Sequence, residues 1–379
     1  MVPKLKIGVA GLGRAFAVML PTFVRDPRVA LVAAADPRAG ARAQFEADFQ
    51  CRVYREIAEL CADPNVDAVY VATPHQFHAE HAIAALSAGK HVLVEKPMAL
   101  SLEECRAMIA AAQQAGRQLV VGHSHSFDLP ILHARKLIES GKYGRVRMIS
   151  ALDYTDFLYR PRRPEELDTS AGGGVFFNQA AHQVDILRLL AGSPVKSVRC
   201  SAGAWDAKRP TEGAYSAHLA FAGGVFASAV YSGYAHFDSD EFQGWIGEMG
   251  QKKDAELYGV TRKMLVGDEM ALKNNRNYGG REYRSNAVAA HQHFGLFVVS
   301  CEKADLRPQP TGVMVYGDSE RRLERLAPPQ VPRSEVIDEL YGAVLQGKAP
   351  LHGGEWAMAT LQTCLAMLES SRQAKEVLL

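Results

Sequence analysis

The sequence has no closely spaced pair of cysteines, no long apolar run and almost no net charge. Its six cysteines form no CxxC pair of the kind that builds zinc or redox sites, so reduced and mostly buried thiols are expected. No apolar stretch approaches the roughly 18 residues that a membrane-spanning helix needs, and the N-terminus enters a strand-like run directly, which predicts a cytoplasmic, unprocessed protein. With 43 basic and 42 acidic residues, no overall field recruits nucleic acid or a membrane surface.

The length of the chain predicts two domains. Its 379 residues exceed the roughly 250 to 300 at which a single hydrophobic core stops growing. The first part alternates apolar runs with segments of helical period, and the runs are LKIGVAG, RVALVAAAD, DAVYVAT, KHVLVEK and RQLVVGH. These runs are apolar on successive residues, as in strands that helices cover on both faces. A doubly wound parallel sheet is therefore expected over residues 1–125.

The second part, residues 126–379, has a different pattern. Runs with period-two character predict an antiparallel sheet, and they are RVRMISALDYTDF, VKSVRCSAGAW, AYSAHLAFAGG and VFASAVYSGYAHF. Gly223 and Gly224 predict a tight hairpin between the last two runs. One helix is expected at about 181–191, and the helical segments from about 331 to 379 are expected to pack across the domains.

Several residues of the first domain bear on where its helices begin, end or bend. Ser101 and Glu104 have the spacing of a capping box, and Gly89 and Gly116 stand where helices should end. Pro21 falls inside a helical segment, where a kink or an early stop is expected because proline removes a backbone donor.

A glycine-containing loop directly follows the first predicted strand. It consists of Gly11, Leu12, Gly13, Arg14 and Ala15. Glycine allows the tight turn, and it lets a dinucleotide pyrophosphate approach backbone amides at the start of a helix. Phe16 replaces the third glycine of the motif, so an ordinary strand-to-helix turn is the alternative.

Asp36 ends the second predicted strand, about 20 residues beyond the loop, where a carboxylate can hold ribose hydroxyls. Because a carboxylate there repels a 2′-phosphate, NAD is favoured over NADP. Arg38 leaves NADP possible, since its guanidinium can bind that phosphate, stack on adenine or face solvent.

Two motifs stand at the carboxyl ends of neighbouring strands, the edge where open α/β sheets bind ligands. The first contributes Thr73, Pro74, His75 and His78, and the second contributes Glu95 and Lys96. Histidines that begin a helix are often surface residues, and a lysine at a strand end is often solvated. A lysine facing a cofactor crevice, however, can exchange protons near neutrality if it is partly desolvated.

A glycine triplet, residues 172–174, precedes the third motif. Asn178 and His182 are four residues apart, and they share a face if a helix begins near Asn178. The alternative is that Asn178 caps this helix and His182 is a core residue.

Together, the GLG loop with Asp36, TPxxxH, EKP and GGGx(3)Nx(3)HxxD strongly resemble the Gfo/Idh/MocA family of dehydrogenases in order and spacing over nearly the whole chain. The resemblance implies an α/β protein with a Rossmann domain and a C-terminal α/β domain whose large open sheet mediates dimers or tetramers. It implies that Lys96 is the catalytic proton-transfer residue and that His182 is the second catalytic residue. Asn178 replaces the usual aspartate and Ala180 the usual glycine, which argues against a polyol substrate.

Within this family, GRAFAVMLPTFVRDPRV, YRPRRPEELDTSAGGGVFFNQAAHQVD and FQGWIGEMGQKKD are most similar to phthalate 4,5-cis-dihydrodiol dehydrogenases. Three arginines before the glycine triplet fit this resemblance, because guanidinium forks bind carboxylates. The predicted substrate site comprises Arg160, Arg162, Arg163, His123, Asn178 and His182. The alternative for the arginines is a solvated loop balanced by Glu165 and Glu166.

The sequence thus predicts an NAD-dependent dehydrogenase that oxidises a CHOH group, with 4,5-dihydro-4,5-dihydroxyphthalate as the expected substrate. A sugar or inositol dehydrogenase, a lyase or hydrolase that retains its NAD, and a dinucleotide sensor without turnover are the alternatives. Lys96 and His182 argue against the sensor. No metal site is expected, and the expected partners are a small-molecule substrate and further copies of the chain in a homodimer or homotetramer.

Overall fold

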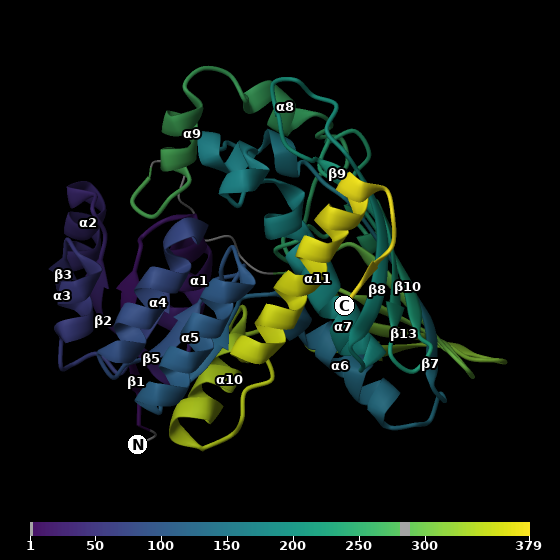
Figure 1. Ribbon diagram of the computed structural model, residues 1–379, viewed down its shortest axis with the longest axis horizontal. Coiled ribbons are helices and arrows are strands. Elements are labelled where there is room, and N and C mark those ends of the chain that lie inside the picture. The colour runs from purple at the N-terminus through teal and green to yellow at the C-terminus, as the bar shows by residue number, and fades with distance from the viewer. Residues whose placement is uncertain (1–2, 281–288) are drawn as a thin grey trace. The chain divides into compact units, whose positions relative to one another are not determined.

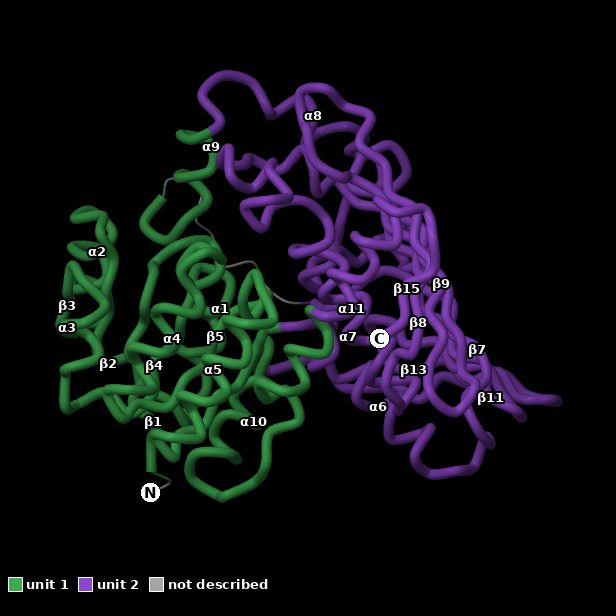
Figure 2. Tube along the Cα trace, viewed as in Figure 1, with its two compact units in different colours: residues 1–123, 270–285, 331–361 green, residues 124–269, 286–330, 362–379 purple. Residues whose placement is uncertain are grey.

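The computed structural model describes residues 3–280 and 289–379. The chain forms two compact units (Figure 2). Unit 1 comprises Met1–His123, Met270–Ser285 and Val331–Leu361, and unit 2 comprises Ser124–Glu269, Asn286–Gln330 and Gln362–Leu379. The predicted boundary at residue 125 lies close to the first break between the units. The division into 1–125 and 126–379, and the packing of the C-terminal helices across domains, stay predictions.

Unit 1 contains a six-stranded sheet in the order β3-β2-β1-β4-β5-β6, and all its pairs are parallel. Its strands are β1 (Leu5–Ala10), β2 (Val29–Ala35), β3 (Arg52–Tyr54), β4 (Ala68–Val71), β5 (His91–Val94) and β6 (Leu119–Val121). The five predicted strands are confirmed, and the short strand β3 was missed. The strand order reverses between β1 and β4, which is the switch point beside which open α/β sheets bind ligands.

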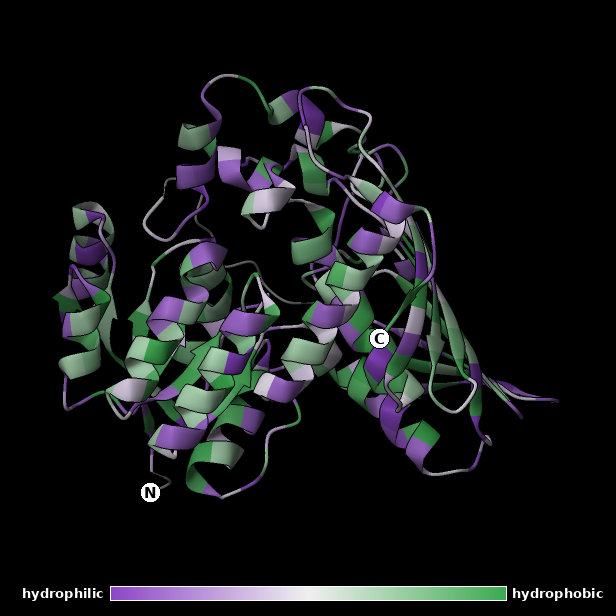
Figure 3. Ribbon diagram, in the orientation of Figure 1, coloured by the Kyte–Doolittle hydropathy of each residue, from purple (hydrophilic) through white to green (hydrophobic). Residues whose placement is uncertain are grey.

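Helices separate these strands along the chain (Figure 1). They are α1 (Arg14–Arg25), α2 (Ala39–Phe49), α3 (Ile57–Ala62), the short η1 (His75–Phe77), α4 (His78–Ser87) and α5 (Leu102–Ala115). Helices α9 (Glu269–Asn275) and α10 (Ser334–Leu345) follow much later in the sequence. The strands of this sheet are mostly hydrophobic (Figure 3) and buried, as sheets covered by helices require. The capping box of Ser101 and Glu104 is confirmed at the start of α5, and Gly116 ends that helix in the left-handed conformation.

Helix α1 continues through Pro21 to Arg25, so the early stop is wrong, and the kink that was the other expected outcome stays a prediction. The helix buries Phe16, Met19 and Phe23 on one face. A proline inside a helix costs about 3 kcal/mol, whereas each large apolar side chain contributes about 1.5–3 kcal/mol when buried. Burial of the apolar face therefore outweighs the cost of the proline.

Unit 2 contains a nine-stranded sheet in the order β14-β13-β12-β11-β7-β10-β9-β8-β15. The strands are β7 (Val146–Tyr154), β8 (Val195–Gly203), β9 (Ala214–Phe221), β10 (Phe226–Ser232), β11 (Leu296–Cys301), β12 (Asp305–Gln309), β13 (Gly312–Tyr316), β14 (Arg321–Arg325) and β15 (Val377–Leu378). Every pair is antiparallel except β7 with β10. The predicted α/β class with a mostly antiparallel second sheet is confirmed, as is the hairpin at Gly223 and Gly224.

The helical segments of unit 2 include α6, which contacts β12 and β13, and α7, which contacts β7 and β10. They are η2 (His125–Phe127), α6 (Leu129–Glu139), η3 (Phe157–Tyr159), η4 (Pro164–Leu167), η5 (Thr169–Ala171), η6 (Phe176–Ala180), α7 (Ala181–Ala191), η7 (Ser239–Gln243) and α8 (Val260–Met264). The predicted helix at 181–191 is α7. Helix α11 (Gly354–Gln373) contains the break between Leu361 and Gln362.

The sequence predicted neither a membrane-spanning helix nor disulfide bonds. Over residues 3–280 and 289–379, no helix combines the length and the apolar character needed to cross a membrane. The six cysteines all lie within these ranges and none of them forms a disulfide.

Candidate functional site

The glycine loop follows β1 and leads into α1. Gly11 has a φ of +94°, and a Cβ there would lie 2.9 Å from the carbonyl oxygen of Ala72, so only glycine fits without strain. Gly13 precedes α1, and a Cβ there would have no neighbour within 4 Å. The N-cap residue Gly13 has no side chain to cap α1, and the first turn of the helix carries no acid. The loop therefore leaves space at a helix N-terminus, where an anionic pyrophosphate is stabilised.

Phe16 occupies the position of the third glycine of the motif, and its side chain is part of the core of unit 1. Its ring is fully buried in unit 1, with its centroid 5.1 Å from that of Tyr278 and 5.9 Å from that of Phe45. The contact with Tyr278 is edge-on, and aromatic pairs of this kind add about 0.5–1.5 kcal/mol to the burial itself. At this position the chain has a buried aromatic side chain, whereas a glycine would let the helix pack closely against the strand.

The Asp36 carboxylate is 4% exposed and accepts four hydrogen bonds within unit 1. The backbone N–H groups of Leu12 and Arg38 each donate to it at 2.8 Å, and the Arg38 guanidinium donates at 2.9 and 3.0 Å. Arg38 also donates to the Leu12 carbonyl oxygen at 2.7 Å. Asp36 thus orients both the glycine loop and Arg38, a role that the sequence did not indicate.

The TPxxxH motif follows β4, with Thr73 and Pro74 before η1 and His75 within it. His78 begins α4 and is fully buried, with Nδ1 2.8 Å from the Pro97 carbonyl oxygen and Nε2 2.9 Å from that of Thr73. Burial lowers the pKa of His78. Because a neutral imidazole has one N–H, it donates to one of these carbonyls at a time. The His78 ring thus joins two backbone segments, and both of its nitrogens face protein carbonyls.

The EKP motif follows β5. Glu95 is buried, and the Tyr70 hydroxyl donates to its Oε1 at 2.5 Å. Burial raises the pKa of Glu95, although Tyr70, Arg333 and Lys96 oppose this shift. Lys96 is partly buried at the carboxyl end of the strand, as predicted from its position.

In unit 2 the glycine triplet is closely packed. A Cβ on Gly173 would lie 2.6 Å from the backbone of Glu166, and Gly174 has a φ of +74°. The next turn, η6, is a π-helix, a conformation that often occurs at functional sites. Asn178 lies inside this turn and donates its side-chain amide to the Gly174 carbonyl oxygen at 2.9 Å. The helix therefore starts before Asn178, and the alternative that this residue is its N-cap is wrong.

His182 stands at the start of α7 and is 6% exposed. Its Nδ1 accepts the backbone N–H of His125 at 3.4 Å, and its ring centroid lies 4.7 Å from that of His125 and 5.0 Å from that of Phe294. His123, which was predicted to contact substrate, is 3% exposed and follows β6 in unit 1.

The three arginines of the predicted substrate loop have partners within unit 2. Arg160 donates to Asp156 at 2.8 Å and to Glu248 at 3.0 Å. Arg162 donates to the Phe157 carbonyl oxygen at 2.6 Å and lies over the Phe157 ring.

Arg163 pairs with Glu165 at 2.8 Å and with Glu166 at 3.6 Å, the two residues named in the alternative interpretation of this loop. Sequence reasoning missed Glu248, Asp128 and His125. No local pattern marks Glu248, because it is distant in the chain from Arg160 and His125, which it contacts.

Comparison with known proteins agrees with this architecture. The model of the oxidoreductase family with an NAD-binding Rossmann fold, GFO_IDH_MocA, matches residues 5–123, and the GFO/IDH/MocA C-terminal domain matches residues 131–253. The chain is 52% identical over 378 residues to a 1-carboxy-3-chloro-3,4-dihydroxycyclohexa-1,5-diene dehydrogenase of Comamonas testosteroni, covering 97% of this chain and 95% of that protein.

A scyllo-inositol 2-dehydrogenase (NAD(+)) of Bacillus subtilis is 32% identical over 197 residues, covering 52% of this chain and 56% of that protein. The crystal structure of a putative dehydrogenase from Bordetella bronchiseptica RB50 superposes with a TM-score of 0.95 at 42% identity, covering 99% of this chain and all of that one. The chain therefore belongs to the Gfo/Idh/MocA family of oxidoreductases, whose N-terminal domain is an NAD-binding Rossmann fold.

Proposed function

We propose that the protein is an NAD-dependent dehydrogenase that oxidises a carboxylated cyclohexadiene cis-diol to the corresponding catechol. The observation that carries this proposal is the 52% identity, over 97% of the chain, to a relative named for a carboxylated dihydroxycyclohexadiene. Among such diols, the loop that contains Arg160, Arg162 and Arg163, here called the arginine loop, favours 4,5-dihydro-4,5-dihydroxyphthalate, because this diol has two carboxylates.

The glycine loop fits a dinucleotide, since Gly13 leaves open space at the start of α1. Residues Gly11 to Ala15 would hold the pyrophosphate, Asp36 and Arg38 the adenosine ribose, and the motifs after β4 and β5 the nicotinamide half. Bound NAD supplies the hydride acceptor for the reaction.

Lys96 would take the hydroxyl proton of one carbinol, and the hydride leaves the same carbon. His182 would hydrogen-bond the hydroxyl oxygen and orient it. The resulting hydroxy ketone tautomerises to an aromatic catechol, so the overall reaction is downhill and only the first step needs the enzyme.

The first experiment follows absorbance at 340 nm with phthalate diols, monocarboxylated diols, inositols and sugars as substrates. Accumulation of NADH with a carboxylated diol is the expected result. Turnover without accumulation would instead indicate a lyase or hydrolase that retains NAD. NADH formation from inositols or sugars alone would contradict the proposed substrate class.

The second experiment tests the base. Lys96→Met should fold and bind NAD, yet lose about 100- to 10,000-fold in kcat, the usual effect of removing a positioned general base. Lys4→Met, at an exposed position in the same unit, is the control. If Lys96→Met kept more than about a tenth of the kcat, His182 would be the next candidate base.

We also propose that the protein forms a homodimer or homotetramer through the sheet of unit 2. Met148 and Phe226 are register partners on neighbouring strands, and they are 38% and 44% exposed. Adjacent exposed apolar side chains on a sheet are typical of protein interfaces. Sedimentation of the purified protein tests this assembly, and Phe226→Lys should weaken it.

A further inference from the structure

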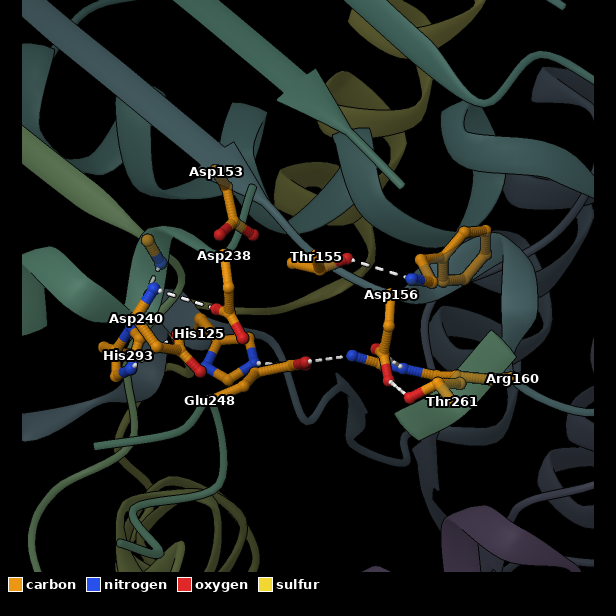
Figure 4. Close-up of polar contacts among 12 residues, drawn as sticks. His125, Asp153, Thr155, Asp156, Arg160, Asp238, Asp240, Glu248, Thr261 and His293 are labelled. Atoms are coloured by element: carbon orange, nitrogen blue, oxygen red, sulfur yellow. Dashed lines mark hydrogen bonds and ion pairs between the residues drawn. The ribbon is translucent and has the colours of Figure 1, made fainter. Parts of the chain in front are cut away.

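Five buried or half-buried side chains of unit 2 form a row in which the charges alternate in sign, and Figure 4 shows four of them, His125, Glu248, Arg160 and Asp156. Asp128 contacts Nδ1 of His125 at 2.7 Å, and Glu248 contacts Nε2 of the same ring at 3.4 Å. The other carboxylate oxygen of Glu248 accepts from Arg160 at 3.0 Å, and Arg160 donates to Asp156 at 2.8 Å. We call these five residues the charge row.

The geometry of the charge row sets the protonation of His125. Both ring nitrogens face carboxylates, but a neutral imidazole has only one N–H. In a neutral ring, the lone pair of the other nitrogen would therefore face the lone pairs of a carboxylate oxygen. An imidazolium donates to both. Burial lowers the pKa of His125, but Asp128 and Glu248 outweigh it and raise the value to about 9.

Other aromatic and titratable side chains lie near His125 and its two carboxylates. The ring is 1% exposed and also faces the rings of His182 and Phe294. Charged or titratable groups near Glu248 include Arg160, which favours its ionised form, Asp153 and Tyr231, and His291 lies near Asp128. Burial raises the pKa of Asp153 to about 8, so that this carboxyl is mostly neutral at pH 7.

His125 also acts on His182 through its backbone. Its N–H donates to Nδ1 of His182, so this nitrogen is an acceptor and carries no proton. A neutral His182 with an accepting Nδ1 carries its proton on Nε2. The cationic His125 ring, 4.7 Å away, further disfavours a second positive charge on His182.

We propose that His125 is a positioning residue: fixed as an imidazolium by Asp128 and Glu248, it holds His182 as the neutral tautomer protonated at Nε2. His182 then donates a hydrogen bond to the substrate oxygen and leaves proton abstraction to Lys96. This second step rests on the proposed function. The tautomer itself does not, and it is measurable without substrate.

The direct test is nuclear magnetic resonance of the full-length protein with NAD, with ¹⁵N-labelled histidine. His182→Gln and His125→Gln identify the two rings among the thirteen histidines. We expect His182 to have a protonated Nε2 and an unprotonated Nδ1 from pH 6 to 8, and His125 to carry two protons up to about pH 8. A proton on Nδ1 of His182, or a neutral His125 at pH 7, would overturn the proposal.

Glu248→Gln tests the cause. It should move the titration of His125 down by at least one pH unit and shift the acidic limb of the kcat profile to higher pH, with KM for NAD unchanged. Asp128→Asn provides the same test if Glu248→Gln fails to fold, and Glu302→Gln, in the same unit, is the control. If His125 titrated in both charge-row variants at the same pH as in the wild-type protein, the proposal would be refuted. Absence of turnover with every diol would refute the proposed function and leave the tautomer result standing.

Discussion

Removal of the His125 imidazole should change how the stability of the protein depends on pH. The pKa of His125 is raised from 6.5 to about 9 in the folded state. A histidine with a raised pKa contributes stability that is fully present below about pH 6.5 and is lost as pH rises towards 9. Since one pKa unit corresponds to 1.36 kcal/mol, the shift amounts to about 3 kcal/mol. His125 is 1% exposed, so solvent screens this contribution little.

The assay is urea-induced unfolding at pH 6 and pH 9.5, with Trp205 and Trp245 as fluorescent reporters in unit 2. The wild-type protein should lose about 3 kcal/mol more between the two pH values than His125→Gln does. Asp153 also titrates in this range, but its contribution is common to both proteins and cancels in the difference. His218→Gln, at an exposed position on β9, is the matched control. Equal losses in wild type and His125→Gln would refute the assignment of His125 as an imidazolium.

Three further predictions concern the cofactor loop, the arginine loop and the glycine triplet. The wild-type protein should have a higher kcat/KM with NAD than with NADP. Asp36→Asn should shift this preference towards NADP, because it removes a negative charge that repels the 2′-phosphate. A higher kcat/KM of the wild-type protein with NADP would contradict the prediction. Arg163→Ala should raise KM for an acidic diol about tenfold or more without changing KM for NAD. Unchanged kinetics with the diol would instead mean that Arg163 is only a structural partner of Glu165. Gly173→Ala should destabilise the protein by about 1–3 kcal/mol in thermal unfolding, because the added Cβ would lie 2.6 Å from the Glu166 backbone. An unchanged Tm would mean that the backbone of this loop shifts to accommodate the Cβ at little cost.

Much of the fold was predictable from the sequence because its signals are local. The continuous apolar runs predicted five of the six parallel strands, and the spacing of Ser101 and Glu104 predicted the start of α5. The strands β11 to β14 were not predicted. Of the two outcomes expected at Pro21, the early stop did not occur, because the stabilisation that offsets the proline comes from burial against the rest of unit 1.

The sequence by itself determined the class of each unit and the order of the motifs along the chain. It placed Lys96 at a strand end and His182 on a helix, since both positions follow from short-range periodicity. Only the tertiary structure decided how the charged side chains pair. Arg160 and Glu248 are 88 residues apart, and Glu248 lies still further along the chain from His125. Pairing across such distances leaves no periodic signal, and the folded chain alone brings two carboxylates to one buried imidazole.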